Sequence, residues 1–329
     1  MRSNRERLAQ AAIVKALHMR TRAGYAPRDP VCVYDLAEQL GIEVRFVDIP
    51  SMEGIYKGPV HPTIILSSLR PPGRQSYNCG HELGHHDLGH GAQFDELIDE
   101  RSRSRRFDPK EFQADCFAGA LLMPQSAVRR GFSVRGWDPV TCSPESFYMI
   151  ATWLSVGYQT LIHHMGRALR MLDTHRTEEL LGHQPKDLRA RLIGCDCREN
   201  VIVADQHWSG RAIDVQVTDF VLLPPGVRLE GECIALLEQD RQQSLVRAVT
   251  PGIGRVVAEE SSWSAYVRVC RQQFVGRAQY RFEEEVDDAE DYLHPDEQQS
   301  LHRMGGGFLE ADGTGHRRTD ARDHDGDRL

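Results

Sequence analysis

Two histidines and a glutamate form the pattern in this chain that is best able to do chemistry. His81, Glu82 and His85 stand in the order H-E-x-x-H, within the stretch YNCGHELGHHDLGH at residues 77–90. Residues four apart on a helix lie on one face, so both imidazoles can bind the same metal ion. Catalytic zinc sites use three protein ligands and keep one position open for a water molecule, which the metal activates. We therefore interpret Glu82 as the general base that accepts a proton from this water.

A third ligand is expected from a separate element, because H-E-x-x-H alone also fits a solvated helix with two surface histidines. Glu111 and Asp115 form an E-x-x-x-D pattern that opens the apolar run at residues 117–124. We expect Glu111 to bring a carboxylate oxygen to the zinc. Asp115, one turn further on, is expected to accept the N–H of a liganding histidine and to fix its tautomer.

The metzincin form of the motif, HExxHxxGxxH, is excluded. It requires glycine at position 88 and histidine at position 91, where this chain has Leu88 and Gly91. His86 and His90 are therefore not expected to bind the metal.

At these residues the chain resembles the ImmA/IrrE family of zinc peptidases. The motif HELGH, the block EFQADCFAGALLMP, the approach AEQLGI at residues 37–42 and the turn at Gly54 carry the resemblance, which covers about residues 8–172. It implies a minimal gluzincin-like metallopeptidase fold that cleaves a helix-turn-helix transcriptional repressor, often in a stress response or a mobile element. By motif position it implies His81, His85 and Glu111 as zinc ligands and Glu82 as catalytic base. Cys79 departs from the pattern, and we interpret it as a buried structural cysteine rather than a thiol that acts on the zinc.

Composition limits the class of protein. A chain of 329 residues is expected to hold two or three domains, and a formal charge of −8 does not favour broad contact with nucleic acid. Eight cysteines without a C-x-x-C pair are typical of reduced thiols in a cytosol. The short apolar run at residues 11–17 is broken by Lys15, which indicates a helix rather than a signal peptide. We therefore expect a cytoplasmic protein of the α+β class that does not cross a membrane.

The first domain, residues 1–135, is predicted to be the zincin-like metallopeptidase. Helices are expected at about residues 4–22 and 33–40. Strands are expected at residues 43–48, 54–58 and 63–67, and their small sheet would offer an edge that can hold an extended peptide.

Residues 136–190 are predicted to form a helical segment with helix-turn-helix-like spacing at residues 149–165. Two interpretations stay open: contact with DNA, or a helical pair packed on the peptidase. The modest local basic charge favours packing. The residues expected on the apolar side are Ala151, Leu154, Val156, Leu161 and Met165, and those expected on the exposed face are Gln159, Thr160, His163 and Arg167.

Residues 191–284 are predicted to be a β-rich sensor or partner-binding domain, with its last strand at residues 279–284. The resemblance implies a GAF-like domain at this position, because a radiation-response branch of the family carries one after its peptidase domain. Its apolar stretches lie between turn sequences such as those at residues 224–226 and 251–254. Residues 285–329 are acidic and rich in Gly and His, and we expect them to be disordered.

Two functions follow from these observations. The first is a zinc endopeptidase that cleaves a regulatory protein, which the resemblance implies to be a helix-turn-helix repressor. The alternative is a non-proteolytic, zinc-containing transcriptional regulator that binds DNA or sequesters a repressor. Glu82 favours the first, because a structural zinc site needs no base and closes its fourth position with another ligand.

Overall fold

The structure, a computed structural model, describes residues 3–58, 60–91, 93–96, 107–208 and 211–283. All of them fall within one compact unit, Met1–Asp291. The predicted tail at residues 285–329 lies outside the described residues.

The N-terminal helix α1 (Asn4–Arg22) begins at a capping box. The hydroxyl of Ser3 accepts a hydrogen bond from the backbone N–H of Glu6, and the Glu6 carboxylate accepts one from the backbone N–H of Ser3. Small side chains at Ala12 and Ala16 are fully buried, which lets α1 pack closely on α4 (Pro109–Leu122). A short helix, α2 (Val33–Gln39), then leads into the first sheet.

The first sheet has the strand order β13-β1-β3-β2-β4. The three predicted strands are confirmed, with β1 parallel to β3 and β2 antiparallel to β3. The fifth strand, β13, comes from far along the chain and pairs antiparallel with β1. The strands of this sheet are β1 (Glu43–Val47), β2 (Met52–Lys57), β3 (Thr63–Ser67), β4 (Gln93–Glu96) and β13 (Gly276–Arg277).

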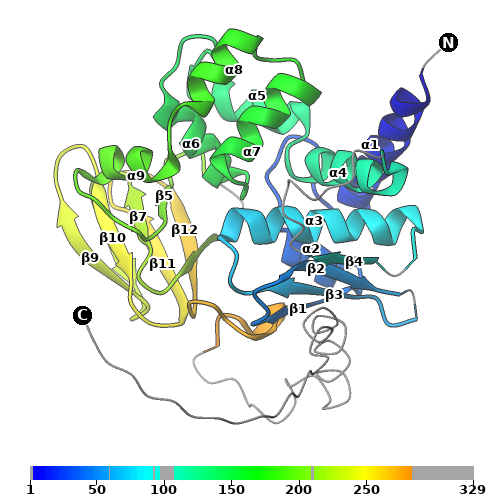
Figure 1. The fold of residues 1–329 in the computed structure, drawn as a ribbon. Helices are drawn as coiled ribbons and strands as arrows, with labels where there is room; N and C mark the ends of the chain where they lie inside the picture. Colours follow the sequence, from blue (N-terminus) through cyan, green and yellow to red (C-terminus); the bar gives the residue numbers. More distant parts are fainter. Residues whose placement is uncertain (1–2, 59, 92, 97–106, 209–210, 284–329) are drawn as a thin grey trace, which may run out of the picture. The chain divides into compact units, whose positions relative to one another are not determined.

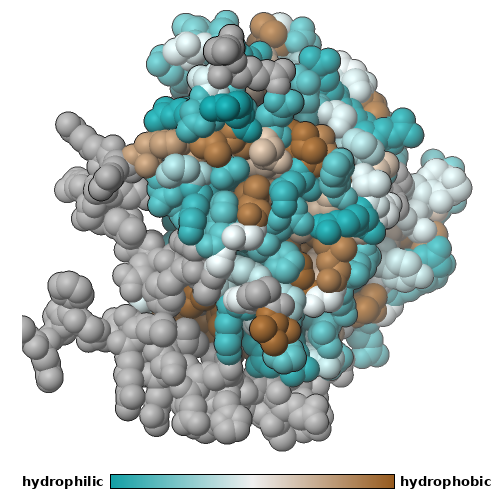
Figure 2. All heavy atoms as spheres, turned by 90° about the vertical axis from the view of Figure 1, so that its right-hand side faces the viewer, coloured by the Kyte–Doolittle hydropathy of each residue, from teal (hydrophilic) through white to brown (hydrophobic). Residues whose placement is uncertain are grey.

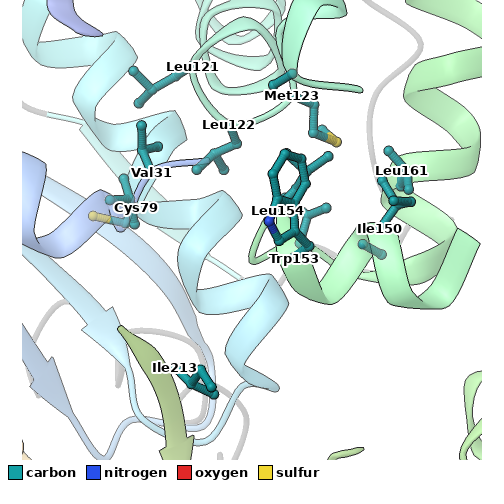
Figure 3. Close-up of a cluster of buried hydrophobic side chains, with 14 of the residues drawn as sticks. Val31, Cys79, Leu121, Leu122, Met123, Ile150, Trp153, Leu154, Leu161 and Ile213 are labelled. Carbon is teal, nitrogen blue, oxygen red and sulfur yellow. The ribbon is translucent and has the colours of Figure 1, made fainter. Parts of the chain in front are cut away.

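The helix with the H-E-x-x-H motif, α3 (Pro72–Leu88), lies across one face of this sheet, and α4 packs against it (Figure 1). The two helices approach closely at Gly84, where an added β-carbon would lie 3.1 Å from Cα of Ala114. Helix α3 ends at Gly89, whose φ of 70° is a left-handed conformation that favours glycine. Buried apolar side chains of both helices, including those of Cys79, Leu121 and Leu122, continue into a common core (Figure 3).

The helical segment after α4 packs on the α3–α4 pair. Helix α6 (Pro144–Trp153) and helix α7 (Tyr158–His163) are joined by a turn, and α7 continues into a π-helical turn, η1 (His164–Ala168). An added β-carbon on Gly73 of α3 would lie 2.6 Å from the backbone nitrogen of Gly157, so the start of α3 and the start of α7 touch. The five side chains predicted on the apolar side of this segment are all buried, namely Ala151, Leu154, Val156, Leu161 and Met165. The remaining helices of this segment are α5 (Gln125–Ser133), α8 (Thr174–Leu181) and α9 (Pro185–Ile193).

The β-rich region forms two four-stranded sheets, ordered β5-β7-β10-β9 and β6-β12-β11-β8. The α+β class is thereby confirmed, while the gluzincin-like, helix-turn-helix-like and GAF-like assignments stay predictions. The strands of these sheets are β5 (Val201–Val203), β6 (Ile213–Gln216), β7 (Phe220–Leu223), β8 (Val227–Glu230), β9 (Ile234–Gln239), β10 (Ser244–Ala248), β11 (Gly252–Ala258) and β12 (Ser264–Cys270).

The strand predicted at residues 279–284 is wrong. Residues Ala278–Tyr280 form a 3-10 turn, and the strand in this part of the chain is the two-residue β13. The physical reason is Arg281, which is buried and bends the chain inward to bind the carboxylates of Asp35 and Asp214 at 3.1 and 3.3 Å.

The predicted boundaries after residues 135, 190 and 284 are untested and stay predictions. Contacts do join the β-rich region to the first sheet. The edge strand β13 is one of them, and the ion pairs of Asp35 on α2 with Arg281 and with Arg268 of β12 are another.

Within the described part of the chain, no helix is both long and apolar enough to cross a membrane. The face drawn in Figure 2 carries several separate groups of hydrophobic side chains among hydrophilic ones.

Candidate active site

Three metal-binding side chains converge where α3 and α4 meet. Nε2 of His85 lies 3.0 Å from Nε2 of His81, and Oε2 of Glu111 lies 3.2 Å from the same His81 nitrogen. Oε1 of Glu111 lies 3.5 Å from Nε2 of His85. Among the described residues this trio is the one group of metal-binding side chains that can hold an ion, with its donor atoms within 4.8 Å of one another.

The donor set fits zinc. Ligand bonds of about 2.0–2.2 Å in a tetrahedral site place neighbouring donor atoms roughly 3.3 Å apart, and the separations here are 3.0–3.5 Å. Two imidazoles and one carboxylate are also a donor set found in catalytic rather than structural zinc sites. Both histidines are buried, whereas the Glu111 side chain is 39 % exposed, so the trio can be reached from the Glu111 side.

The α3–α4 contact positions the trio. His81 and His85 are one turn apart on the buried face of α3, and Gly84 between them lets the backbone of α4 approach at Ala114. Glu111 lies in the first turn of α4, which Asp108 caps by accepting a hydrogen bond from the backbone N–H of Lys110 at 2.8 Å.

Each histidine has a further polar neighbour. Oδ1 of Asp115 lies 3.1 Å from Nδ1 of His81. A neutral His81 that donates from Nδ1 to Asp115 keeps its Nε2 lone pair directed at the other two donors. Nδ1 of His90 lies 3.1 Å from Nδ1 of His85, so His90 contacts the site from behind and is not part of the trio.

Glu82 is buried, with 1 % of its surface exposed, and its side chain lines the same cavity as His81 and Glu111. Strand β2 makes room for this carboxylate at Gly54. A β-carbon on Gly54 would lie 2.6 Å from Oε1 of Glu82, so any larger residue at position 54 would have to displace this carboxylate.

The hydroxyl groups of Tyr56 and Tyr77, the two tyrosines near the motif, already have hydrogen-bond partners within the protein. The Tyr56 hydroxyl lies 2.8 Å from Nδ1 of His86, and the Tyr77 hydroxyl donates to the backbone oxygen of Asp115 at 3.4 Å. Burial raises the pKa of both tyrosines above the usual value, so both side chains are neutral hydrogen-bonding groups.

A cavity of about 1310 Å³ opens at the trio and extends beyond it. It runs along the side of α3 that carries Asn78, Gln75 and Pro72 to a far wall formed by α6, α7 and the β-rich region. Gln159 and Thr160, predicted on the exposed face of a helix-turn-helix, line this cavity. No pattern in the sequence indicates the far wall, because its residues come from segments more than sixty positions from the motif.

A family profile described as the IrrE N-terminal-like domain of peptidase M78 matches residues 37–165, less than half of the chain. No curated protein shows a significant match. Among solved structures, a Mycobacterium tuberculosis transcriptional regulator is similar at 18 % identity, over 48 % of this chain and 46 % of that chain, with a TM-score of 0.31. The chain thus spans less than half the length of that regulator, and a similarity of this size is too low to indicate a function. The profile match confirms the resemblance seen in the sequence over residues 37–165, which match the IrrE N-terminal-like domain.

Proposed function

We propose that the chain is a zinc-dependent endopeptidase. The observation that carries the proposal is the convergence of His81, His85 and Glu111 beside the buried carboxylate of Glu82, in the wall of a large cavity. Two imidazoles and a carboxylate would hold the ion and leave one position open, as hydrolytic zinc sites do.

Each residue has a role that follows from its contacts. A bound zinc ion supplies Lewis-acid activation of water and of the substrate carbonyl. Glu82 accepts a proton from the attacking water and delivers it to the leaving nitrogen. Asp115 holds His81 in the tautomer that binds metal, across a distance of 3.1 Å.

A protein segment is the substrate that suits this site. The cavity is far longer than the trio itself, and ligand pockets of up to roughly 1,000 Å³ already bury a drug-sized molecule. A cavity of about 1310 Å³ therefore has room for several residues of an extended chain. The family resemblance makes a helix-turn-helix transcriptional repressor the proposed substrate.

The alternative, a regulator with a structural metal, explains less of the site. A structural zinc site is closed by four protein ligands, whereas the described residues offer three. A buried glutamate beside those ligands has no use in a purely structural site.

The proposal is tested by a comparison of new protein N-termini in cells that express either the wild type or Glu82→Gln. Glutamine has the shape of glutamate but cannot accept a proton, so we expect zinc content and melting temperature to stay close to wild type. Cleavage should fall by about 10² or more, since general-base catalysis supplies roughly 10²–10⁴-fold. The peptidase proposal would be wrong if both chains produced the same new N-termini and relieved the repression of the same genes equally. The alternative, a non-proteolytic regulator, would then replace it.

A further inference from the structure

The far end of the cavity carries a charge imbalance. Among the described residues, the charged side chains that line this end or bind its lining are arginines and aspartates, with the arginines in excess by one. The positively charged residues are Arg189, Arg211, Arg268 and Arg281, and the negatively charged ones are Asp35, Asp214 and Asp219.

Two of the arginines are bound by two of the aspartates. Arg268 donates to both oxygens of Asp214 at 2.6 and 2.7 Å and binds Asp35 at 2.9 Å. Arg281 binds the same two carboxylates at 3.1 and 3.3 Å. The charges in this four-residue network therefore cancel.

Arg189 and Arg211 are the two cations outside that network, and the third aspartate, Asp219, accepts hydrogen bonds from Asn200 and Gln216 instead of from either arginine. Of the two, Arg211 is the one that is bound next to the start of α3. Its guanidinium donates to the backbone oxygen of Trp153 and to the hydroxyl of Ser155, both at 2.6 Å, and it stacks on the Trp208 ring at 5.0 Å. Its Nε atom is buried and has no hydrogen-bond partner among the described residues, none of which brings a carboxylate into contact with it. Neutral acceptors thus fix the orientation of the guanidinium. Asp214 and Asp35 act on its charge only from beyond ion-pair distance, and their own ion pairs are with Arg268 and Arg281.

A buried guanidinium on a cavity wall that makes no direct ion pair within the described part of the chain indicates a ligand that brings a carboxylate, because buried charges in proteins are normally paired. The uncapped N-terminus of α3 reaches the same wall, where Gly73 touches the turn at Val156 and Gly157 next to Ser155. Pro71 and Pro72 have no N–H, and Arg74 and Gln75 donate theirs to the backbone oxygen of Pro71, so this end of α3 offers an anion the helix dipole and the N–H of Gly73. The two features act in the same direction.

We propose that Arg211 binds an acidic side chain of the protein substrate and thereby sets where the enzyme cuts. The inference rests on the proposed peptidase function, which it deepens by naming a requirement on the substrate sequence. The length of helix α3 gives the distance between the Arg211 end of the cavity, beside Gly73, and the metal-binding trio at His81. The eight residues from Gly73 to His81 span about 12 Å at roughly 1.5 Å per residue. An extended chain covers this length in about four residues at roughly 3.3 Å each. The acidic residue therefore lies about four residues from the scissile bond.

The test uses short peptides whose position in the cavity is fixed by a zinc-binding group. One series carries a C-terminal hydroxamate and a second an N-terminal mercaptoacetyl group, so that the two series extend in opposite directions from the metal. Each peptide has an alanine–glutamine background with a single glutamate, and the matched peptide has glutamine at that position. Binding to the zinc-loaded, full-length Glu82→Gln protein is measured by fluorescence anisotropy, so cleavage is not required.

In one series, we expect glutamate near the fourth residue to improve affinity by about tenfold over glutamine, as charge-assisted hydrogen bonds do. Arg211→Gln should abolish this preference, and Arg211→Lys should keep part of it. Arg74→Gln should retain it, because Arg74 also lines the cavity but is exposed to solvent and has a direct ion pair with Glu53 at 2.9 Å, which Glu53 shares with Arg70.

Three outcomes would overturn the inference. If glutamate and glutamine peptides bind equally at every position, the requirement for an acidic residue is wrong, while the proposed peptidase function still stands. If the position of the glutamate in the peptide has no effect on affinity, but free N-acetylglutamate binds in a way that depends on Arg211, the site binds a small anion instead of the substrate. If no peptide of either series binds, the zinc site itself fails, and the inference fails with it. Melting curves of each variant show whether a loss of preference comes from unfolding.

Discussion

The carboxylate of Glu82 occupies the space that a side chain at position 54 would need. A β-carbon on Gly54 would lie 2.6 Å from Oε1 and 3.1 Å from Cγ of Glu82. The glycine therefore belongs to the catalytic arrangement although it carries no functional group, since strand β2 and helix α3 approach closely only because position 54 has no side chain.

We expect Gly54→Ala to reduce cleavage by about 10²-fold, which is a typical cost of a misplacement of roughly 1 Å in an active site. The added methyl must displace the glutamate, but it does not touch the trio of metal-binding side chains. Zinc content should therefore remain near wild type. The matched control is Lys57→Ala, at the exposed end of the same strand, which should keep full activity. A fully active Gly54→Ala would mean that Glu82 tolerates displacement and is not the base.

Glu111→Ala is expected to lower the zinc content of the purified protein, because it removes one of three ligands and leaves the two imidazoles of α3. Elemental analysis after dialysis against a weak chelator measures the loss. If the variant kept one zinc per chain with unchanged affinity, the third ligand would have to be assigned elsewhere.

Asp115→Asn has a milder predicted effect. Loss of a carboxylate that orients a liganding histidine typically costs about 10–100-fold in metal affinity. We therefore expect Asp115→Asn to bind zinc more weakly than wild type and more tightly than Glu111→Ala, in competition with a fluorescent chelator. Wild-type affinity would show that the 3.1 Å contact to His81 does not tune the site.

The sequence predicts the local part of this structure well. Strand β1 and strand β3 follow from their apolar patterns, and the trio follows from spacing on α3 and a second motif at Glu111. The edge strand of the first sheet and the far wall of the cavity could not be predicted in this way. Strand β13 is only two residues long, so its sequence has no periodicity that predicts a strand. The guanidinium of Arg211 is held in place by Trp153 and Ser155, which lie more than fifty positions away in the sequence. Contacts of that kind depend on tertiary packing rather than on any local pattern.

A chain that ends at Ala190 is predicted to keep its zinc, because every donor of the site lies before that residue. The contacts across the predicted boundary add a further expectation. Removal of β13 exposes the edge of β1, and removal of Arg268 and Arg281 takes away the ion pairs of Asp35. The truncated chain should therefore melt at a lower temperature while it still binds metal. Loss of the metal would show that the β-rich region is part of the catalytic core.

The last prediction concerns the contact between η1 and α4, which depends on a neutral histidine. Nε2 of His164 lies 3.0 Å from the backbone oxygen of Met123, and its ring fills the space beside Gly119, where an added β-carbon would lie 2.7 Å away. Burial lowers the pKa of His164 to about 4, and the hydrogen bond to Met123 only partly opposes this shift.

The direction of the pH effect follows from the two pKa values. In the unfolded chain a histidine titrates near 6.5, so between about pH 6.5 and pH 4 the unfolded chain binds more protons than the folded one. The free energy of unfolding should therefore fall as the pH is lowered through this window, by at most about 3 kcal/mol. Above pH 6.5 the contribution of the neutral ring is fully present.

Denaturant unfolding at a series of pH values measures this slope. Glutamine can donate a similar hydrogen bond to Met123 but does not titrate, so His164→Gln should flatten the slope between about pH 6.5 and pH 4. The control is His18→Gln, because His18 is exposed on α1 and its replacement should leave the slope unchanged. Identical slopes for wild type and His164→Gln would mean that His164 is hydrated in solution. The helical pair would then not be held against α4 as the structure shows, and its predicted DNA-facing side would again be a candidate surface.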